Sequence, residues 1–213
     1  MKKYFLLAFV ALSMTALAQH VTPLSIQLAD VKIDSLRTLY ISEPPMYIAS
    51  LNMVEQALAK NADEIKAAKA ELKVEQTHGK EMGNSLKEAN KMVAALKKLY
   101  AKEEGELKSM QKVVEKQQKT LGKQTALNKE TRENYQNLLE KQQKELGYSL
   151  REVADRQRAI ADLEQALQKG QTGLQAYIHE TEMKATELAQ LEATLKQRMA
   201  TLKAEQKTAK TLQ

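Results

Sequence analysis

The sequence predicts an all-α protein in which a long coiled coil follows a cleaved signal peptide. An apolar residue recurs at nearly every seventh position from Leu51 to Tyr135 and, after a shift of four residues, from Leu139 to Leu202. No proline follows Pro45, and Ala, Glu, Lys, Leu and Gln dominate the composition. A seven-residue period of this length is typical of helices that wind around one another. This composition is typical of long helices rather than of a globular core.

The two apolar rows form the predicted coiled-coil seam. Gly79, Asn128 and Thr181 interrupt them. We expect every remaining member to pack between helices. The members are Leu51, Leu58, Ile65, Leu72, Leu86, Val93, Tyr100, Leu107, Val114, Leu121, Tyr135, Leu139, Leu146, Val153, Ile160, Leu167, Leu174, Leu188, Leu195 and Leu202.

A third apolar column, made of Met92, Leu99 and Val113, widens the stripe in the middle of the first row. A wide apolar stripe needs more than one neighbouring helix. We therefore expect this region to pack in a trimer or larger bundle, or against another part of the same chain.

Residues 1–18 have the features of a secretory signal peptide. Met1-Lys2-Lys3 is positively charged, an apolar run follows to Leu17, and Ala16-Leu17-Ala18 fits a cleavage site before Gln19. A membrane anchor is the alternative, but the run is shorter than the roughly 20 residues that span a bilayer. We expect a periplasmic or secreted protein with no transmembrane span after cleavage. Because the chain has no Cys, neither disulfides nor lipid attachment at a cysteine contribute.

Residues 19–45 form a short leading segment. Thr22 before Pro23 favours an N-cap followed by proline in the first helical turn, although the alternation within 26–33 also fits a short strand. Pro44 and Pro45 then break the backbone. We expect the long helical region, residues 46–213, to start at this break.

The four-residue shift between Tyr135 and Leu139 allows two architectures. A continuous helix accommodates such a stutter by local unwinding, which gives one long rod. The alternative is one long helical hairpin that turns within residues 122–134, the most polar part of the coil. We favour the rod, because neither a proline nor a pair of adjacent glycines marks a turn.

The charge of the chain is mildly basic, at +6 overall and +4 without Lys2 and Lys3. Such a charge allows contact with anionic polymers, unfolded acidic clients or lipid headgroups. Lys and Glu intermixed along helices are more typical of a solvated face. We expect no nucleic-acid partner.

The residues provide little for catalysis or metal binding. His20, His78 and His179 lie far apart, and none has a ligand partner at metal-binding spacing. Nucleotide-binding, hydrolase and metalloprotease motifs are absent, and a coil offers no dry pocket to perturb carboxylates. We predict a non-enzyme without catalytic, cofactor or metal sites. Asp34-Ser35-Leu36 resembles a bacterial O-glycosylation acceptor, although three residues also occur by chance.

In size, export signal, basic charge and long helical arms, the chain resembles the periplasmic chaperone Skp family. That family builds a trimerisation body from strands at both chain ends, whereas the end from Ala209 to Gln213 has no strand character here. The sequence predicts an envelope coiled-coil protein with a structural or adaptor role, acting through self-association or pairing with a partner helix. The alternatives are a Skp-like holdase and an accessory subunit of a secretion, efflux or wall-remodelling complex.

Overall fold

The computed structural model describes residues 21–29, 33–124 and 127–212 of the 213-residue chain. The described part contains α2 (Ile33–Ser42), α3 (Pro44–Lys123), α4 (Lys129–Ala209) and a short 3-10 helix, η1 (Lys210–Leu212), and it contains no strand. The all-α prediction is therefore confirmed. The signal peptide predicted at residues 1–18 lies outside the described residues, as do the side chains of Asp34 and Ser35.

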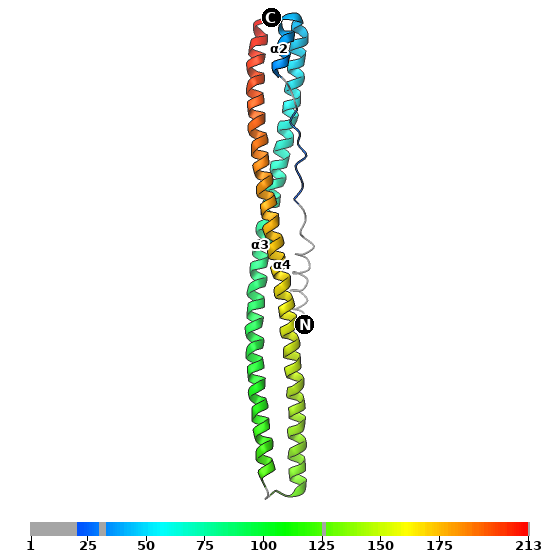
Figure 1. Cartoon of the computed structure of the whole chain (residues 1–213), viewed down its shortest axis with the longest axis vertical. Helices are drawn as coiled ribbons and strands as arrows, with labels where there is room; N and C mark the ends of the chain where they lie inside the picture. The colour runs from blue at the N-terminus through cyan, green and yellow to red at the C-terminus, as the bar shows by residue number, and fades with distance from the viewer. Residues whose placement is uncertain (1–20, 30–32, 125–126, 213) are drawn as a thin grey trace. The chain divides into compact units, whose positions relative to one another are not determined.

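The two long helices, α3 and α4, pack as a helical hairpin (Figure 1). Polar pairs between them follow one antiparallel register: Glu55 with Gln206, Lys69 with Glu192, Lys97 with Glu164 and Gln118 with Gln143. From each pair to the next, the position on α3 advances by as many residues as the position on α4 retreats. The favoured continuous rod is therefore wrong, and the hairpin alternative is the observed fold.

The turn between α3 and α4 depends on Asn128. Its side-chain oxygen accepts a 2.8 Å hydrogen bond from the Thr131 backbone N–H, so Asn128 is the N-cap of α4. The Gln124 N–H bonds the Leu121 carbonyl as α3 ends, and the Arg132 guanidinium bonds the Gln124 carbonyl. An N-cap and one arginine close this turn without proline or paired glycines. The first heptad row lies on α3 as far as Leu121, and the second row lies on α4 from Leu139 onward. Tyr135, which extends the first row in the sequence, lies on α4 and is exposed, so the apparent stutter is not a defect within one continuous helix.

The junction between α2 and α3 lies at Glu43. The Glu43 N–H donates to the Leu39 carbonyl at 2.9 Å, and the Glu43 carbonyl accepts from the Tyr47 N–H at 3.0 Å. Pro44 and Pro45 occupy the first turn of α3, where backbone N–H groups have no partner within the helix. The proline pair therefore starts α3 without losing a hydrogen bond.

Residues 21–29, here called the leading strap, form neither helix nor strand. The expected helix after Thr22 is wrong, and so is a strand over residues 26–29. Side chains of α3 bond the strap backbone instead: Asn61 accepts from the Ala29 N–H at 2.9 Å and donates to the Gln27 carbonyl at 3.1 Å. An extended backbone is stable here because the neighbouring helix satisfies its polar groups.

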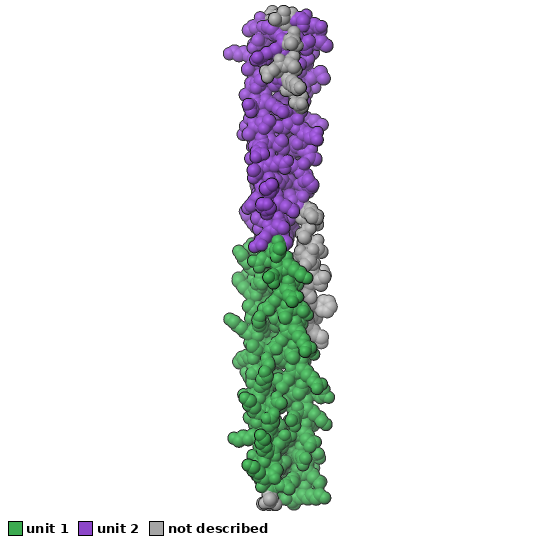
Figure 2. Space-filling model, viewed as in Figure 1, with its two compact units in different colours: residues 1–17, 83–172 green, residues 18–82, 173–213 purple. Residues whose placement is uncertain are grey.

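The chain divides into two compact units, shown in Figure 2. Unit 1 contains residues 83–172, and its buried core includes Val93, Tyr100 and Val153. Unit 2 contains residues 18–82 and 173–213. Its core joins both long helices to Ile33 of α2, and strap residues Leu24, Ile26 and Leu28 pack against it. Each unit thus has its own hydrophobic core, and in unit 2 a third segment covers the helix pair.

Candidate functional site

The predicted seam residues occupy three kinds of position. Leu107, Leu121 and Leu146 are half-buried, while Tyr135 is 53% exposed on α4. All the others are buried: Leu51, Leu58, Ile65, Leu72, Leu86, Val93, Tyr100, Val114, Leu139, Val153, Ile160, Leu167, Leu174, Leu188, Leu195 and Leu202. The structure therefore places most of both heptad rows inside the hairpin.

The column three residues after the first seam row changes its environment within unit 1. Ala89 is buried and Leu96 is half-buried, but Met110 is 55% exposed. A straight α-helix drifts by about 20° per heptad relative to a perfect 3.5-residue repeat. Toward the turn this drift brings the neighbouring column of Gln111 and Gln118 to the interface instead. The helix surface around Met110 is left uncovered.

A groove between α3 and α4 results on this side of unit 1. It consists of two adjoining hollows of about 640 and 540 Å³ that share Gln117 and Gln142. Exposed apolar side chains line both hollows: Met110, Val113, Tyr135 and Leu138. We call this feature the hairpin groove. It is lined on α3 between Ser109 and Leu121, by Gln124 and Leu127 after the end of α3, and on α4 between Tyr135 and Ser149.

Exposed lysines lie along the face of α3 that points away from α4. Because they are spaced by three, four or fourteen residues, they share one helix face. Lys116 lines the groove itself. None of these lysines forms an ion pair with any described residue, in contrast to Lys97 and Lys108 nearby. We call them the lysine row: Lys98, Lys112, Lys116, Lys119 and Lys123.

The basic charge of the chain belongs to unit 1. Residues 83–172 contain 18 Lys and Arg against 13 Asp and Glu, a formal charge of +5. Residues 18–82 and 173–213 contain 13 against 14, a formal charge of −1. Exposed apolar side chains and unpaired positive charge therefore lie together on unit 1.

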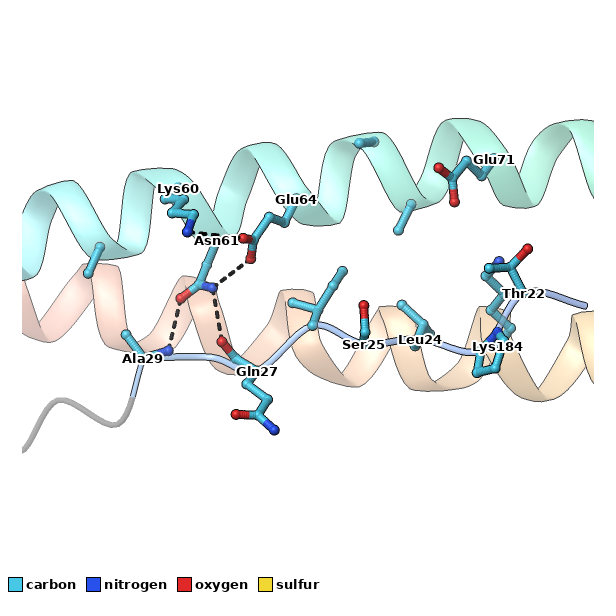
Figure 3. A pocket seen from close by; sticks show the side chains of 15 residues that line it. Thr22, Leu24, Ser25, Gln27, Ala29, Lys60, Asn61, Glu64, Glu71 and Lys184 are labelled. Atoms are coloured by element: carbon cyan, nitrogen blue, oxygen red, sulfur yellow. Dashed lines mark hydrogen bonds and ion pairs between the residues drawn. The ribbon is translucent and has the colours of Figure 1, made fainter.

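Unit 2 has its own hollow of about 730 Å³ between the leading strap and α3 (Figure 3). Its polar side chains bond one another: Asn61 donates to Glu64 at 3.0 Å, and Lys60 lies 3.8 Å from the other Glu64 oxygen. Because these groups are already paired, this hollow offers less for a partner than the hairpin groove.

A buried ion pair lies beside this hollow. The Lys184 ammonium contacts both Glu75 carboxylate oxygens at 2.9 and 3.0 Å, and its side chain is only 5% exposed. Glu75 also accepts from the Thr22 backbone N–H, and its carbonyl accepts from the Tyr177 hydroxyl at 3.2 Å. Burial raises the pKa of Tyr177, and the Glu75 charge adds to that shift. This cluster links the strap to both long helices and offers no free reactive group.

A second polar cluster, centred on the buried side chains of Tyr47 and Glu205, joins α2, α3 and α4. Arg37 donates to Glu205 Oε1 from Nε at 2.9 Å and from a terminal guanidinium nitrogen at 2.6 Å. Tyr47 donates to Glu205 Oε2 at 2.7 Å. Arg37 foremost, then Tyr47, holds the pKa of Glu205 below its usual range. These hydrogen bonds connect the three helices, so the cluster stabilises unit 2.

The described residues contain no group of three His, Cys, Asp or Glu side chains placed to bind a metal ion. His78 and Tyr177 meet edge to face with ring centroids 6.4 Å apart, and His179 is exposed. Within the same described ranges, no helix combines the length and apolarity needed to cross a membrane.

Sequence reasoning missed the lysine row because it treated Lys and Glu as one solvated mixture. The signal lay in the heptad positions of these lysines. Between residues 91 and 123, the two seven-residue columns of α3 that point away from α4 contain lysines and no Asp or Glu. Sequence reasoning identified Val113 as part of a third apolar column, but it could not place this residue in one groove with Leu138 of the other helix.

Comparison with known proteins gives no match to a protein family, to a curated protein or to a solved structure.

Proposed function

We propose that this chain is an exported helical-hairpin protein of the cell envelope that acts as an adaptor. Its docking surface is the hairpin groove. The observation that carries the proposal is the exposure of Met110, Val113, Tyr135 and Leu138 along one groove between two helices. Unit 2 supports it, because the leading strap and α2 already cover the α3–α4 pair there. Helix pairing at the groove would bury the apolar side chains left exposed in unit 1.

Export rests on the signal-peptide pattern of residues 1–18, with the periplasm or the exterior as the destination. Mass spectrometry of the protein from the exported fraction should find Gln19 as the first residue. An intact Met1 in that fraction would contradict cleavage.

Photocrosslinking in living cells tests the adaptor role. A photoreactive residue replacing Val113 should give a discrete crosslinked species, whereas the same residue at exposed Ala101, outside the groove lining, should not. Sedimentation velocity of the purified protein then separates self-association from pairing with another protein. The proposal fails if both positions give the same products or if neither gives any.

A holdase for unfolded exported clients is the second candidate. It is favoured by the charge of +5 on unit 1 together with its exposed apolar side chains. A holdase would suppress aggregation of many unrelated acidic proteins in a salt-sensitive way. An adaptor would give one crosslinked partner and no general suppression.

A further inference from the structure

The positive charge of unit 1 comes from one of its two helices. Residues 83–123, the α3 part of the unit, contain 10 Lys against 5 Glu, a formal charge of +5. Residues 124–172, the turn and the α4 part, contain 8 Lys and Arg against 8 Asp and Glu, a formal charge of zero. The net charge of unit 1 is therefore carried by α3 alone.

On α3 this charge is concentrated on the face that points away from α4. The two seven-residue columns of this face contain no Asp or Glu between residues 91 and 123. Besides lysines they contain only small, exposed residues: Ala95, Gly105 and Ser109. The lysine row on this face extends from Lys98 to Lys123, about 38 Å at 1.5 Å per residue. Lysine side chains are thus the only long side chains of these two columns.

Exposed apolar side chains lie next to this positive face. Leu99 is 56% exposed and Met92 is 44% exposed. They occupy the adjoining column of α3, and Leu99 lies three residues before Lys102, on the same side of the helix. Neither Leu99 nor Met92 lines the hairpin groove. Lysines beside exposed apolar side chains are typical of helices that lie on a membrane surface.

We propose that the lysine row binds the surface of a lipid bilayer that contains anionic phospholipids. The ammonium groups would contact headgroup phosphates, and Leu99 and Met92 would enter the boundary between headgroups and acyl chains. Of the lysine row only Lys116 lines the hairpin groove, so this inference goes beyond the proposed adaptor function and does not depend on it.

The type of basic residue argues for a lipid surface rather than an acidic protein. α3 contains no Arg, so every cation of this face is a lysine. Protein interfaces are enriched in Arg and depleted in Lys, and the planar guanidinium binds a carboxylate with fixed geometry. A lysine ammonium is a point charge on a flexible stem. It needs no fixed partner geometry, which suits mobile lipid headgroups.

The exposed apolar side chains argue against a soluble polyanion. Such a polymer would neutralise the lysines, but it would leave Leu99 and Met92 in water. A bilayer surface accommodates both kinds of side chain, because its phosphates lie next to an apolar interior. An anionic bilayer is therefore the partner that fits the whole face.

Vesicle sedimentation tests this inference with protein purified from the exported fraction. At low salt, we expect at least about tenfold tighter binding to phosphatidylcholine vesicles containing about 30% phosphatidylglycerol than to pure phosphatidylcholine vesicles. This difference should shrink as salt rises, since salt screens exposed charges. Wild type and variants carry the same N-terminus, so binding by any other part of the chain is equal among them.

Charge-reversal variants locate the site. The triple variant Lys98→Glu, Lys112→Glu and Lys119→Glu leaves the groove lining intact and should weaken binding to the anionic vesicles by about tenfold or more. A matched triple variant makes the same charge change at exposed positions on α4 of the same unit, and it should weaken binding by less than about threefold. This control consists of Lys141→Glu, Lys144→Glu and Lys169→Glu. Circular dichroism should show unchanged helix content in both triple variants.

The variant Leu99→Gln tests the apolar contact without changing the charge. It should weaken binding to the anionic vesicles by about threefold or more. Val74→Gln is the matched control, since Val74 is 69% exposed on unit 2, and it should bind as tightly as the wild type. Equal binding of these two variants would contradict the entry of Leu99 into the bilayer.

Three further outcomes would overturn the inference: equal binding to both kinds of vesicle at low salt, equal loss in the two triple variants, or binding to soluble polyphosphate without binding to the anionic vesicles. The adaptor function is tested separately, because its crosslinking position, Val113, lines the hairpin groove. If the vesicles fail while Val113 still crosslinks one partner, the membrane inference falls and the adaptor function stands.

Discussion

Tyr47 and Glu205 are 158 positions apart in the sequence, yet the Tyr47 hydroxyl donates a 2.7 Å hydrogen bond to Glu205 Oε2. Both residues are buried, with exposed fractions of 0% and 5%. Arg37 from α2 donates to the other carboxylate oxygen. This arrangement joins the first turn of α3 to the last turns of α4, so it holds these two helix ends together in unit 2.

Replacing Tyr47 with Phe should destabilise the protein by about 1–3 kcal/mol, because the buried Glu205 oxygen loses its donor. Urea unfolding followed by circular dichroism measures this loss. Tyr148→Phe is the matched control, since Tyr148 is 68% exposed, and it should have almost no effect. Equal stability of the two variants would show that the Tyr47 hydrogen bond contributes nothing.

The same pair predicts a loss of stability at alkaline pH. Burial, together with the hydrogen bond to Glu205, raises the pKa of Tyr47 from 10.0 to about 12. Because the folded state holds the phenolic proton more tightly, this contribution is fully present below pH 10 and disappears as pH rises toward 12. Urea unfolding at pH 9 and pH 11.5 should therefore show a larger loss for the wild type than for Tyr47→Phe.

At acid pH, the pKa shift of Glu205 makes the stability of the protein fall as pH decreases, the opposite of the trend expected for Tyr47 at alkaline pH. The pKa of Glu205 lies below the usual 4.5, mainly because of Arg37, so its contribution is present above pH 4.5 and is lost as pH falls through the folded-state pKa. Glu205→Gln should therefore unfold with a weaker acid dependence than the wild type. An unchanged acid dependence would rule out this carboxylate as a source of stability.

The buried Lys184–Glu75 pair should be sensitive to removal of one partner. Lys184→Met leaves the Glu75 carboxylate, whose side chain is only 15% exposed, without its cation and should cost about 3–5 kcal/mol. The double variant Lys184→Met and Glu75→Gln leaves no unpaired charge and should recover most of this loss. Lys97→Met, which removes the exposed pair with Glu164, should cost far less. Equal losses in the single and double variants would contradict a cost from unpaired charge.

The N-cap at the hairpin turn predicts a smaller effect. Asn128→Ala removes the side-chain acceptor of the Thr131 N–H and should cost about 1 kcal/mol. Asn134→Ala, at an exposed position six residues further along the chain in α4, is the control and should be nearly neutral. Thermal unfolding of both variants measures the difference.

Spin labels can measure the hairpin directly, since the chain has no native Cys. Labels on Cys introduced at exposed positions Ala94 and Gln168 should lie within about 30 Å of each other, because antiparallel helix axes pack 8–10 Å apart. Labels at Ala94 and Lys119 lie on one helix and should be about 38 Å apart. Dilution with unlabelled protein restricts the signal to pairs within one chain. A distance near 110 Å for the first pair would restore the rod.

The turn shows where sequence reasoning reached its limit. Heptad spacing predicted long helices, and Leu51 and Leu188 are indeed buried in them. The same spacing included Asn128 as a polar defect in a continuous seam, whereas the structure makes it the cap of α4. A heptad pattern shows which helix face is buried, but it does not show which helix covers that face. Both architectures bury the same residues, so the pattern could not choose between them.

By itself, the sequence determined the helical class, the buried face of each helix and the break at Pro44, because periodicity, proline chemistry and helix propensity act locally. Only the tertiary structure decided the hairpin, the antiparallel register and the covering of unit 2 by the leading strap. It also decided that Met110 and Val113 face the same groove as Leu138. These features depend on contacts between residues far apart in the sequence, whose energies are set by the side chains that meet in space.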